Sequence, residues 1–154
     1  MTRTTLRALL FAGLLAPHAV LAQPIQVEQP WARATAPQQK MGGAYVTLTA
    51  PAGDRLLGAS SPVASRVELH ELRTEGDVKR MRELADGLAL PAGQAVAMSP
   101  GGYHLMLVDL KQPLVAGRAI PLQLRFRDAP PVEVQLQVAP VGAAGPSAKL
   151  GHIH

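Results

Sequence analysis

Cysteine is absent from the 154-residue sequence, and this absence removes several classes of protein at once. Without thiols the chain forms no disulfide, no thiolate zinc site and no iron–sulfur cluster, and it has no cysteine nucleophile. A blue-copper centre is also excluded, because its metal needs a Cys thiolate ligand. Any metal bound by this chain must therefore be held by His, Met or carboxylate side chains.

Aromatic residues are nearly as scarce, since Phe, Trp and Tyr together make up only 3% of the chain. The sequence pI is about 10.0, but the basic residues are interleaved with acidic ones, and no basic stripe carries aromatic stacking platforms. The densest basic stretch, residues 79–82, follows Glu75 and Asp77 and is expected to be a solvated strand edge. The pattern argues against a nucleic-acid partner.

Catalytic motifs are also lacking. The sequence contains no Gly-rich phosphate loop, no nucleophile elbow and no HExxH pair, and the spacing of its carboxylates singles out no general acid and base. We therefore expect a binding protein rather than an enzyme.

Residues 1–22 have the pattern of a cleaved secretory signal peptide. Arg3 and Arg7 give a positive start, residues 8–21 are almost wholly apolar, and residues 20–22 supply small side chains before the expected cleavage site. The apolar run of about 14 residues is shorter than the roughly 20 needed to span a bilayer. The pattern predicts an exported protein whose mature chain begins at Gln23 and has no permanent membrane anchor.

The following residues are typical of an all-β fold. Glycine and proline, 14 of each, separate short runs rich in Val, Leu and Thr. Apolar and polar residues alternate over 122–127 and 132–138, and the Asp-Ala-Pro-Pro segment between these runs predicts a hairpin connection. Nine strands are expected, at Ile25–Glu28, Ala44–Thr49, Arg55–Ala59, Arg66–Arg73, Val78–Leu84, Ala95–Met98, Tyr103–Leu107, Ile120–Arg127 and Val132–Val138. They predict a single-domain Greek-key β-sandwich over residues 23–139.

The composition changes again at residue 140. Small residues with Gly and Pro follow, and the sequence ends in a segment containing His152 and His154. We expect residues 140–154 to form a flexible C-terminal tail.

The spacing of certain His and Met residues in the predicted domain places their side chains close together. His104 and Met106 are separated by one residue on an expected strand, so both side chains leave the same face, about 7 Å apart at the backbone. Met98 is expected to be a core residue, because Met in a β-rich core usually fills a gap. The His104 and Met106 pair therefore offers two metal donors on one face.

A second pair, His70 and Met81, flanks a predicted tight turn in an antiparallel hairpin. If Glu75 and Gly76 are the central turn residues, His70 lies directly opposite Met81, with Cβ atoms about 5 Å apart. A bulged turn at Gly76 would shift this register by one residue. The neighbours of this pair on the same face, including Glu68, are charged, and a polar face is an unusual place for a Met that has no binding role.

Two imidazoles and two thioethers are a donor set suited to Cu(I). Thioether sulfur is soft and uncharged, which disfavours Mg²⁺, Ca²⁺ and Mn²⁺, whereas imidazole accepts copper in either oxidation state. Methionine also survives in an oxidising compartment that would consume a thiolate. We therefore expect His70, Met81, His104 and Met106 to bind Cu(I).

Several short motifs also carry a family resemblance. They are Trp31-Ala32-Arg33, Met41-Gly42-Gly43-Ala44-Tyr45, Ala59-Ser60-Ser61-Pro62, Val67-Glu68-Leu69-His70-Glu71, Met81-Arg82, Pro91-Ala92-Gly93 and Pro100-Gly101-Gly102-Tyr103-His104-Leu105-Met106. Together they resemble the periplasmic copper chaperone family, often called PCuAC. The signature of that family is His, ten residues, Met, about twenty-one residues and His-x-Met. Here the two intervals are ten and twenty-two residues.

The resemblance implies a cupredoxin-like β-sandwich without the blue-copper Cys. It implies that Cu(I) is delivered toward the dinuclear copper centre of cytochrome c oxidase, with subunit II of the oxidase or a thioredoxin-like Sco protein as the copper-accepting partner. Family members commonly carry a tail rich in His and Met that binds further copper, notably Cu(II). This tail has only His152 and His154, which offer at most a weak second site.

Two other functions compete with the chaperone. One is a metal-free exported β-sandwich that binds a protein partner through an edge strand or an exposed patch. Such a protein-interaction module would tolerate Leu in place of Met81 and Met106. The other is an electron-transfer cupredoxin, which the absence of cysteine disfavours because the blue copper centre needs a thiolate.

Overall fold

The computed structural model describes residues 23–146, which contain ten β-strands and no helix. The strands are β1 (Gln26–Arg33), β2 (Met41–Thr49), β3 (Asp54–Ser60), β4 (Ala64–Glu75), β5 (Val78–Glu83), β6 (Leu88–Leu90), β7 (Ala95–Ala97), β8 (Tyr103–Leu110), β9 (Ala119–Phe126) and β10 (Val132–Ala139). Within this part of the chain, no helix exists that could cross a membrane. The predicted signal peptide at 1–22 lies outside the described residues, and so do His152 and His154 of the predicted tail.

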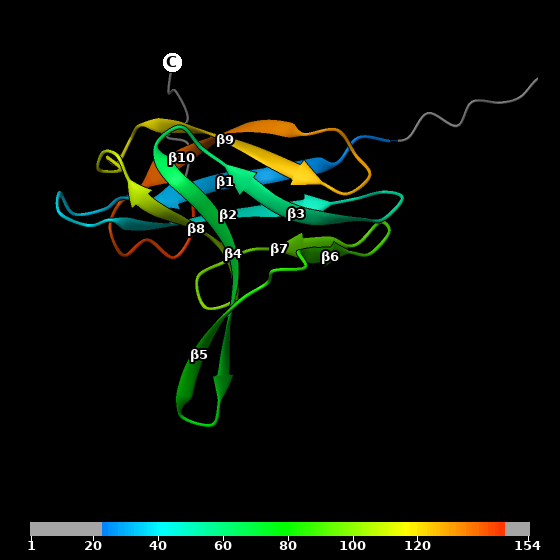
Figure 1. The fold of residues 1–154 in the computed structure, drawn as a ribbon, viewed down its shortest axis with the longest axis horizontal. Coiled ribbons are helices and arrows are strands. Elements are labelled where there is room, and N and C mark those ends of the chain that lie inside the picture. The colour runs from blue at the N-terminus through cyan, green and yellow to red at the C-terminus, as the bar shows by residue number, and fades with distance from the viewer. Residues whose placement is uncertain (1–22, 147–154) are drawn as a thin grey trace, which may run out of the picture.

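Seven of the strands close into a ring. They pair in the order β4-β8-β2-β1-β10-β9-β3, and β3 pairs again with β4. The pairing of β1 with β10 is parallel, and the other pairings of the ring are antiparallel. Figure 1 shows the strands packed as two layers, with β6 and β7 added at one side of the ring. This arrangement confirms the predicted all-β sandwich.

The alternation of apolar and polar residues along the strands accounts for the core. Along β9, Ile120, Leu122, Leu124 and Phe126 are buried, and the residues between them are exposed. The hairpin predicted between β9 and β10 is also present, because these strands pair in antiparallel register. Met98 is buried as expected, at 3% exposure. Leucine dominates the interior, so burial of aliphatic side chains stabilises the sandwich.

Nine of the ten strands were expected from the sequence, and β6 was not. This strand has only three residues, of which Leu88 and Leu90 are buried. It lies between Gly87, whose φ is 82°, and Pro91. A run this short shows no measurable alternation, and its strand conformation depends on pairing with β3.

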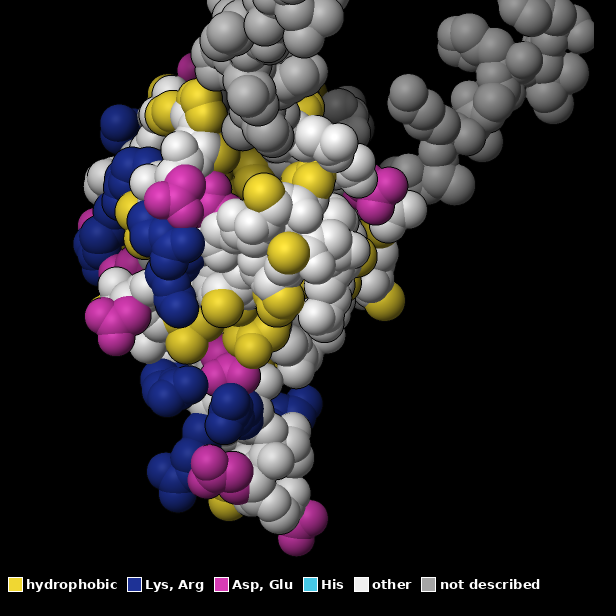
Figure 2. Space-filling view, turned by 90° about the vertical axis from the view of Figure 1, so that its right-hand side faces the viewer, with side chains coloured by type: hydrophobic (Ala, Val, Ile, Leu, Met, Phe, Trp, Pro, Cys, Tyr) yellow, Lys and Arg dark blue, Asp and Glu magenta, His cyan; other side chains and the backbone are white. Residues whose placement is uncertain are grey.

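The β4–β5 hairpin projects from the body of the sandwich. β4 is twelve residues long: it pairs with β8 from Ala64 to Glu71, with β3 at Val67, and with β5 from His70 to Glu75. Figure 1 shows this hairpin extending away from the other strands. Every residue of β5 is exposed, as predicted for a solvated edge. Lys, Arg, Asp and Glu side chains cover much of the projecting hairpin (Figure 2).

The register of this hairpin differs from the one expected. The central turn residues are Gly76 and Asp77 rather than Glu75 and Gly76, so Met81 pairs with Leu72, and His70 pairs with Glu83. Of the two turn residues, only Gly76 has a positive φ, of 62°, which is the pattern of a type II′ turn with Gly in its first central position. The turn therefore moves the pairing by two residues. Because side chains alternate with a period of two, Met81 stays on the face of His70.

Asp54 ties two turns together at the opposite end of the sandwich. Its carboxylate accepts hydrogen bonds from the backbone N–H groups of Arg55 (2.6 Å), Asp128 (3.1 Å) and Ala129 (2.9 Å). Burial alone would raise the pKa of Asp54, but these three bonds and nearby Arg127 outweigh it and hold the pKa below its ordinary value. The ionised carboxylate therefore stabilises the folded state.

We expect Asp54→Ala to lower the free energy of unfolding by about 1–3 kcal/mol at pH 7, because three backbone donors lose their acceptor. The folded-state pKa is lowered, so this contribution is present above the unfolded Asp pKa of about 3.9 and is lost as the pH falls through the folded value. Denaturant titrations between pH 7 and pH 3 measure it. Asp128→Ala is the matched control, since its carboxylate pairs only with exposed Arg127 and should cost little.

Candidate metal centre

His70 on β4 and His104 on β8 are direct cross-strand partners. Their rings lie 5.6 Å apart between centroids and meet edge to face at 75°. Met106 follows two residues after His104, on the same face of β8, and pairs with Glu68 of β4. The structure thus places three of the four predicted ligands in adjacent positions on one face of two neighbouring strands.

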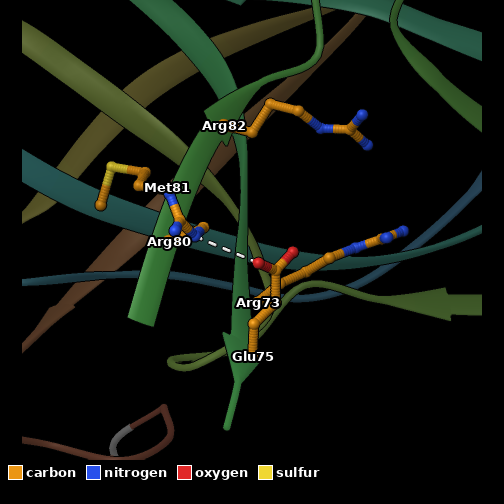
Figure 3. A pocket seen from close by; sticks show the side chains of 5 residues that line it. All are labelled: Arg73, Glu75, Arg80, Met81 and Arg82. Carbon is orange, nitrogen blue, oxygen red and sulfur yellow. Dashed lines mark ion pairs between the residues drawn. The ribbon is translucent and has the colours of Figure 1, made fainter. Parts of the chain in front are cut away.

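Met81 reaches this face from the projecting hairpin. Its partner Leu72 is two residues beyond His70, so Met81 is a diagonal neighbour of that imidazole. Figure 3 shows the Met81 side chain leaving β5 on the side opposite to Arg73 and Arg82. Met81 is 52% exposed, which makes it the most accessible of the four predicted ligands.

Three of the predicted ligands line one shallow hollow, which we call the ligand hollow. Met81, His104 and Met106 form part of its wall, together with Met41 and Tyr45. His70 does not line the hollow and adjoins it through its ring contact with His104. The hollow also includes residues 100–101, which belong to the same motif as His104 and Met106, and residues 141–142, which sequence patterns do not associate with the ligands.

His104 forms the buried end of the donor set, with 6% of its surface exposed. Its Nδ1 lies 3.1 Å from the carbonyl oxygen of Gly102. A carbonyl only accepts, so Nδ1–H donates, and the lone pair of the neutral ring lies on Nε2. Burial lowers the pKa of His104, and the neighbouring His70 lowers it further, although the bond to Gly102 partly opposes both. These contacts favour a neutral imidazole with Nε2 free for a metal.

His70 is held in the opposite orientation by Glu68. Its Nε2 lies 3.0 Å from Glu68 Oε2, and because a carboxylate accepts, Nε2–H donates. Arg66 Nε in turn donates to the other oxygen of Glu68 over 2.6 Å. His70 Nδ1 is buried and has no hydrogen-bond partner within residues 23–146. A buried lone pair of this kind is unusual, and it fits a nitrogen that binds a metal.

Two acidic residues beside His70, Glu68 and Glu83, were given no role in the sequence analysis. One donor atom from each of Glu68, His70 and Glu83 lies within 4.8 Å of the others. Glu68 shares the face of His70 by simple alternation, so its place could be predicted, but its hydrogen bond could not. Glu83 lies opposite His70 only in the register that the turn at Gly76 fixes.

The residues present fit a soft monovalent ion. Each imidazole has one N–H anchored by an oxygen acceptor and a second nitrogen that carries a free lone pair. The oxygen acceptors are the outer partners that metal-binding histidines usually have. Two thioethers complete the set without adding charge, which favours Cu(I) over hard divalent cations.

A stacked aromatic pair supports the floor of the hollow. The rings of Trp31 and Tyr45 lie 4.5 Å apart between centroids, and Trp31 is only 3% exposed. Gly43 lies opposite Met106, and a Cβ at Gly43 would come within 2.7 Å of the Tyr45 hydroxyl. Glycine is therefore required at this position while Tyr45 keeps its place.

Comparison with known proteins gives consistent results. The sequence family described as "Putative lipoprotein LpqE-like" matches residues 25–138. A relative described as "Putative lipoprotein Lxx21020", from Leifsonia xyli subsp. xyli, is 34% identical over 128 residues, which are 83% of this chain and 77% of the relative.

Solved structures with the same fold include PCuAC domains and a protein that binds copper. The copper-bound PCuAC domain from PmoF2 superposes with a TM-score of 0.64 at 27% identity, over 78% of this chain and 96% of that domain. The Cu(I) form of DR1885 from Deinococcus radiodurans superposes with a TM-score of 0.62 at 27% identity, over 79% of this chain and 83% of that protein. The predicted cupredoxin-like sandwich of the PCuAC type is thereby confirmed.

The lowered pKa of His104 predicts how the metal-free protein responds to acid. The unfolded state, with an ordinary His pKa of about 6.5, binds a proton that the folded state resists. The resulting stability is present above about pH 6.5 and is lost as the pH falls through the lowered folded value. In chelator-treated protein, the free energy of unfolding should fall between pH 7.5 and pH 5.5. His104→Asn should show a smaller fall, and an equal fall would contradict this assignment.

Proposed function

The chain belongs to the LpqE-like family, and we propose that it is an exported copper chaperone that carries Cu(I) on His70, Met81, His104 and Met106. The observation that carries this proposal is the cross-strand pair of imidazoles, each with one anchored N–H and one free nitrogen. The copper in the PmoF2 and DR1885 structures supports the choice of metal. Copper is here the cargo of the protein and takes part in no catalytic turnover.

The four donors have separate tasks in this proposal. His104 Nε2 and His70 Nδ1 supply lone pairs from the buried side, where hydrogen bonds to Gly102 and Glu68 prevent the rings from rotating. Met106 adds sulfur from the same strand as His104. Met81 adds sulfur from the exposed hairpin. The hairpin thus closes the set from the solvent side.

Neutral, accessible thioethers also suit delivery. An acceptor with thiolate ligands binds Cu(I) more tightly than thioethers do, so the ion can move to it by ligand exchange. Subunit II of cytochrome c oxidase or a Sco-type protein is the acceptor we propose. The exposed position of Met81 lets such an acceptor approach the ion without unfolding the sandwich.

The export of the protein is part of the same proposal. The segment at 1–22 has signal-peptide character, and a relative described as a lipoprotein supports transfer across the membrane. We place the mature protein in the periplasm, where methionine ligands resist oxidation better than thiolates.

The first test removes the two thioethers. A Met81→Leu, Met106→Leu double variant should lose at least about tenfold in Cu(I) affinity, equivalent to about 1.4 kcal/mol, because the soft donors are gone while volume is kept. Anaerobic competition with a chromogenic Cu(I) chelator measures the loss. Met98→Leu is the control, since Met98 is buried in the core.

A chain ending at residue 146 lacks His152 and His154 and should keep the full affinity for one equivalent of Cu(I). If neither wild type nor any variant competes for Cu(I), the chaperone is excluded. A metal-free protein-interaction module would then be the better explanation.

The second test addresses the anchor of His70. Glu68→Ala leaves Nε2–H without its acceptor, and loss of such an outer partner typically weakens metal binding about 10–100-fold. Glu83→Ala is the matched control, because Glu83 is also close to His70 but makes no hydrogen bond to it. Equal losses of Cu(I) affinity in the two variants would show that negative charge near His70 matters rather than the hydrogen bond.

A further inference from the structure

Met41 is a third thioether at the ligand hollow, and the proposed function assigns it no task. It opens β2, is 52% exposed, and lines the hollow together with Met81, His104 and Met106. Met98, by contrast, is 3% exposed within the core, where a methionine normally serves to fill space. Packing in the core therefore does not explain Met41.

The strand register places Met41 beside Met106. Met41 pairs with Val108 on β8, and Gly43 pairs with Met106, so Met41 and Met106 are diagonal neighbours on one face. Diagonal positions lie about 7–8 Å apart at the backbone, within reach of long side chains. Gly43 has no side chain that could stand between the Met41 sulfur and the Met106 sulfur.

The backbone of Met41 is fixed while its side chain remains free to move. The Gln39 side-chain amide donates to the Met41 carbonyl oxygen over 2.5 Å, and the Met41–Val108 pairing holds the strand. The exposed thioether has three rotatable bonds and no proton to lose, so it can swing between solvent and hollow at any pH.

We propose that Met41 is a transient sulfur ligand through which Cu(I) enters and leaves the ligand hollow. The proposal rests on the function proposed above. In the exchange, a Cu–S bond to Met41 forms as a Cu–S bond to Met81 or Met106 breaks. Copper stays Cu(I), and no proton moves, because thioethers carry none. In the resting state the two imidazoles and the thioethers of Met81 and Met106 hold the ion, and Met41 lies at the edge of the hollow without binding it.

The first experiment observes the sulfur atoms directly. The protein is labelled with [methyl-¹³C]methionine and titrated with Ag(I), a soft d¹⁰ ion that does not change its oxidation state under these conditions. We expect the methyl signals of Met81 and Met106 to shift at one equivalent. The Met41 signal should broaden or shift through exchange, while the buried Met98 signal stays in place.

The second experiment measures rate and affinity separately. Met41→Leu keeps side-chain volume at an exposed position, so folding should be unaffected. The transfer of Cu(I) to an excess of chromogenic chelator, followed by stopped flow, should slow by about tenfold, equivalent to about 1.4 kcal/mol in the barrier. The equilibrium affinity should change by less than about threefold. Met98→Leu should change neither quantity.

The outcomes separate this inference from the proposed function. If Met81 and Met106 do not respond to Ag(I), the proposed copper site itself is wrong. If they respond while the Met41 signal and the transfer rate of Met41→Leu are unchanged, only the inference is overturned. If Met41→Leu weakens affinity as much as Met106→Leu does, Met41 is a permanent ligand, and its transient role is overturned.

Discussion

The pairing of β4 with β8 is the constraint on which the candidate metal centre depends. It sets His70 opposite His104 and Glu68 opposite Met106. A slip of one residue would send the two imidazoles to opposite faces of the sheet. Buried Leu residues on the other face of the same strands, including Leu69, Leu105 and Leu107, resist such a slip because they would be exposed by it. The hydrophobic core on one face of these strands thus fixes the register of the candidate metal donors on the other face.

The sequence predicted the all-β fold because it follows from side-chain alternation, and the same rule predicted that His104 and Met106 share one face. The buried Leu122 and Leu124 of β9, and the shared face of His104 and Met106, are examples of one rule. The hairpin register was wrong by two residues because the turn type depends on where Gly76 falls. The face of Met81 was nevertheless right, since an even shift preserves it. The ligand hollow could not be predicted, because its lining comes from segments that are distant in sequence and that only the fold brings together.

The face of the β4–β5 hairpin opposite to Met81 carries a series of ion pairs. Glu71 pairs with Arg73 at 2.9 Å and with Arg82 at 3.0 Å, and Glu75 pairs with Arg80 at 3.1 Å (Figure 3). Ion pairs as exposed as that between Glu75 and Arg80 contribute little stability, so the ladder between β4 and β5 holds the hairpin. Because every residue of β5 is exposed, this strand adds no buried apolar side chain to the core, and we expect the hairpin to open readily.

A gradient of exposure therefore runs across the donors. His104 is almost fully buried, the His70 side chain is 13% exposed, and Met81 and Met41 are both about half exposed. The imidazoles are fixed by hydrogen bonds and by a stable ladder, so they retain their geometry whether or not a metal is bound. The thioethers at the rim have flexible side chains, and Met81 also lies on a strand with no buried residue. This asymmetry suits the proposed carrier role, because fixed imidazoles keep the site formed and mobile thioethers allow the ion to leave without disturbing the sandwich.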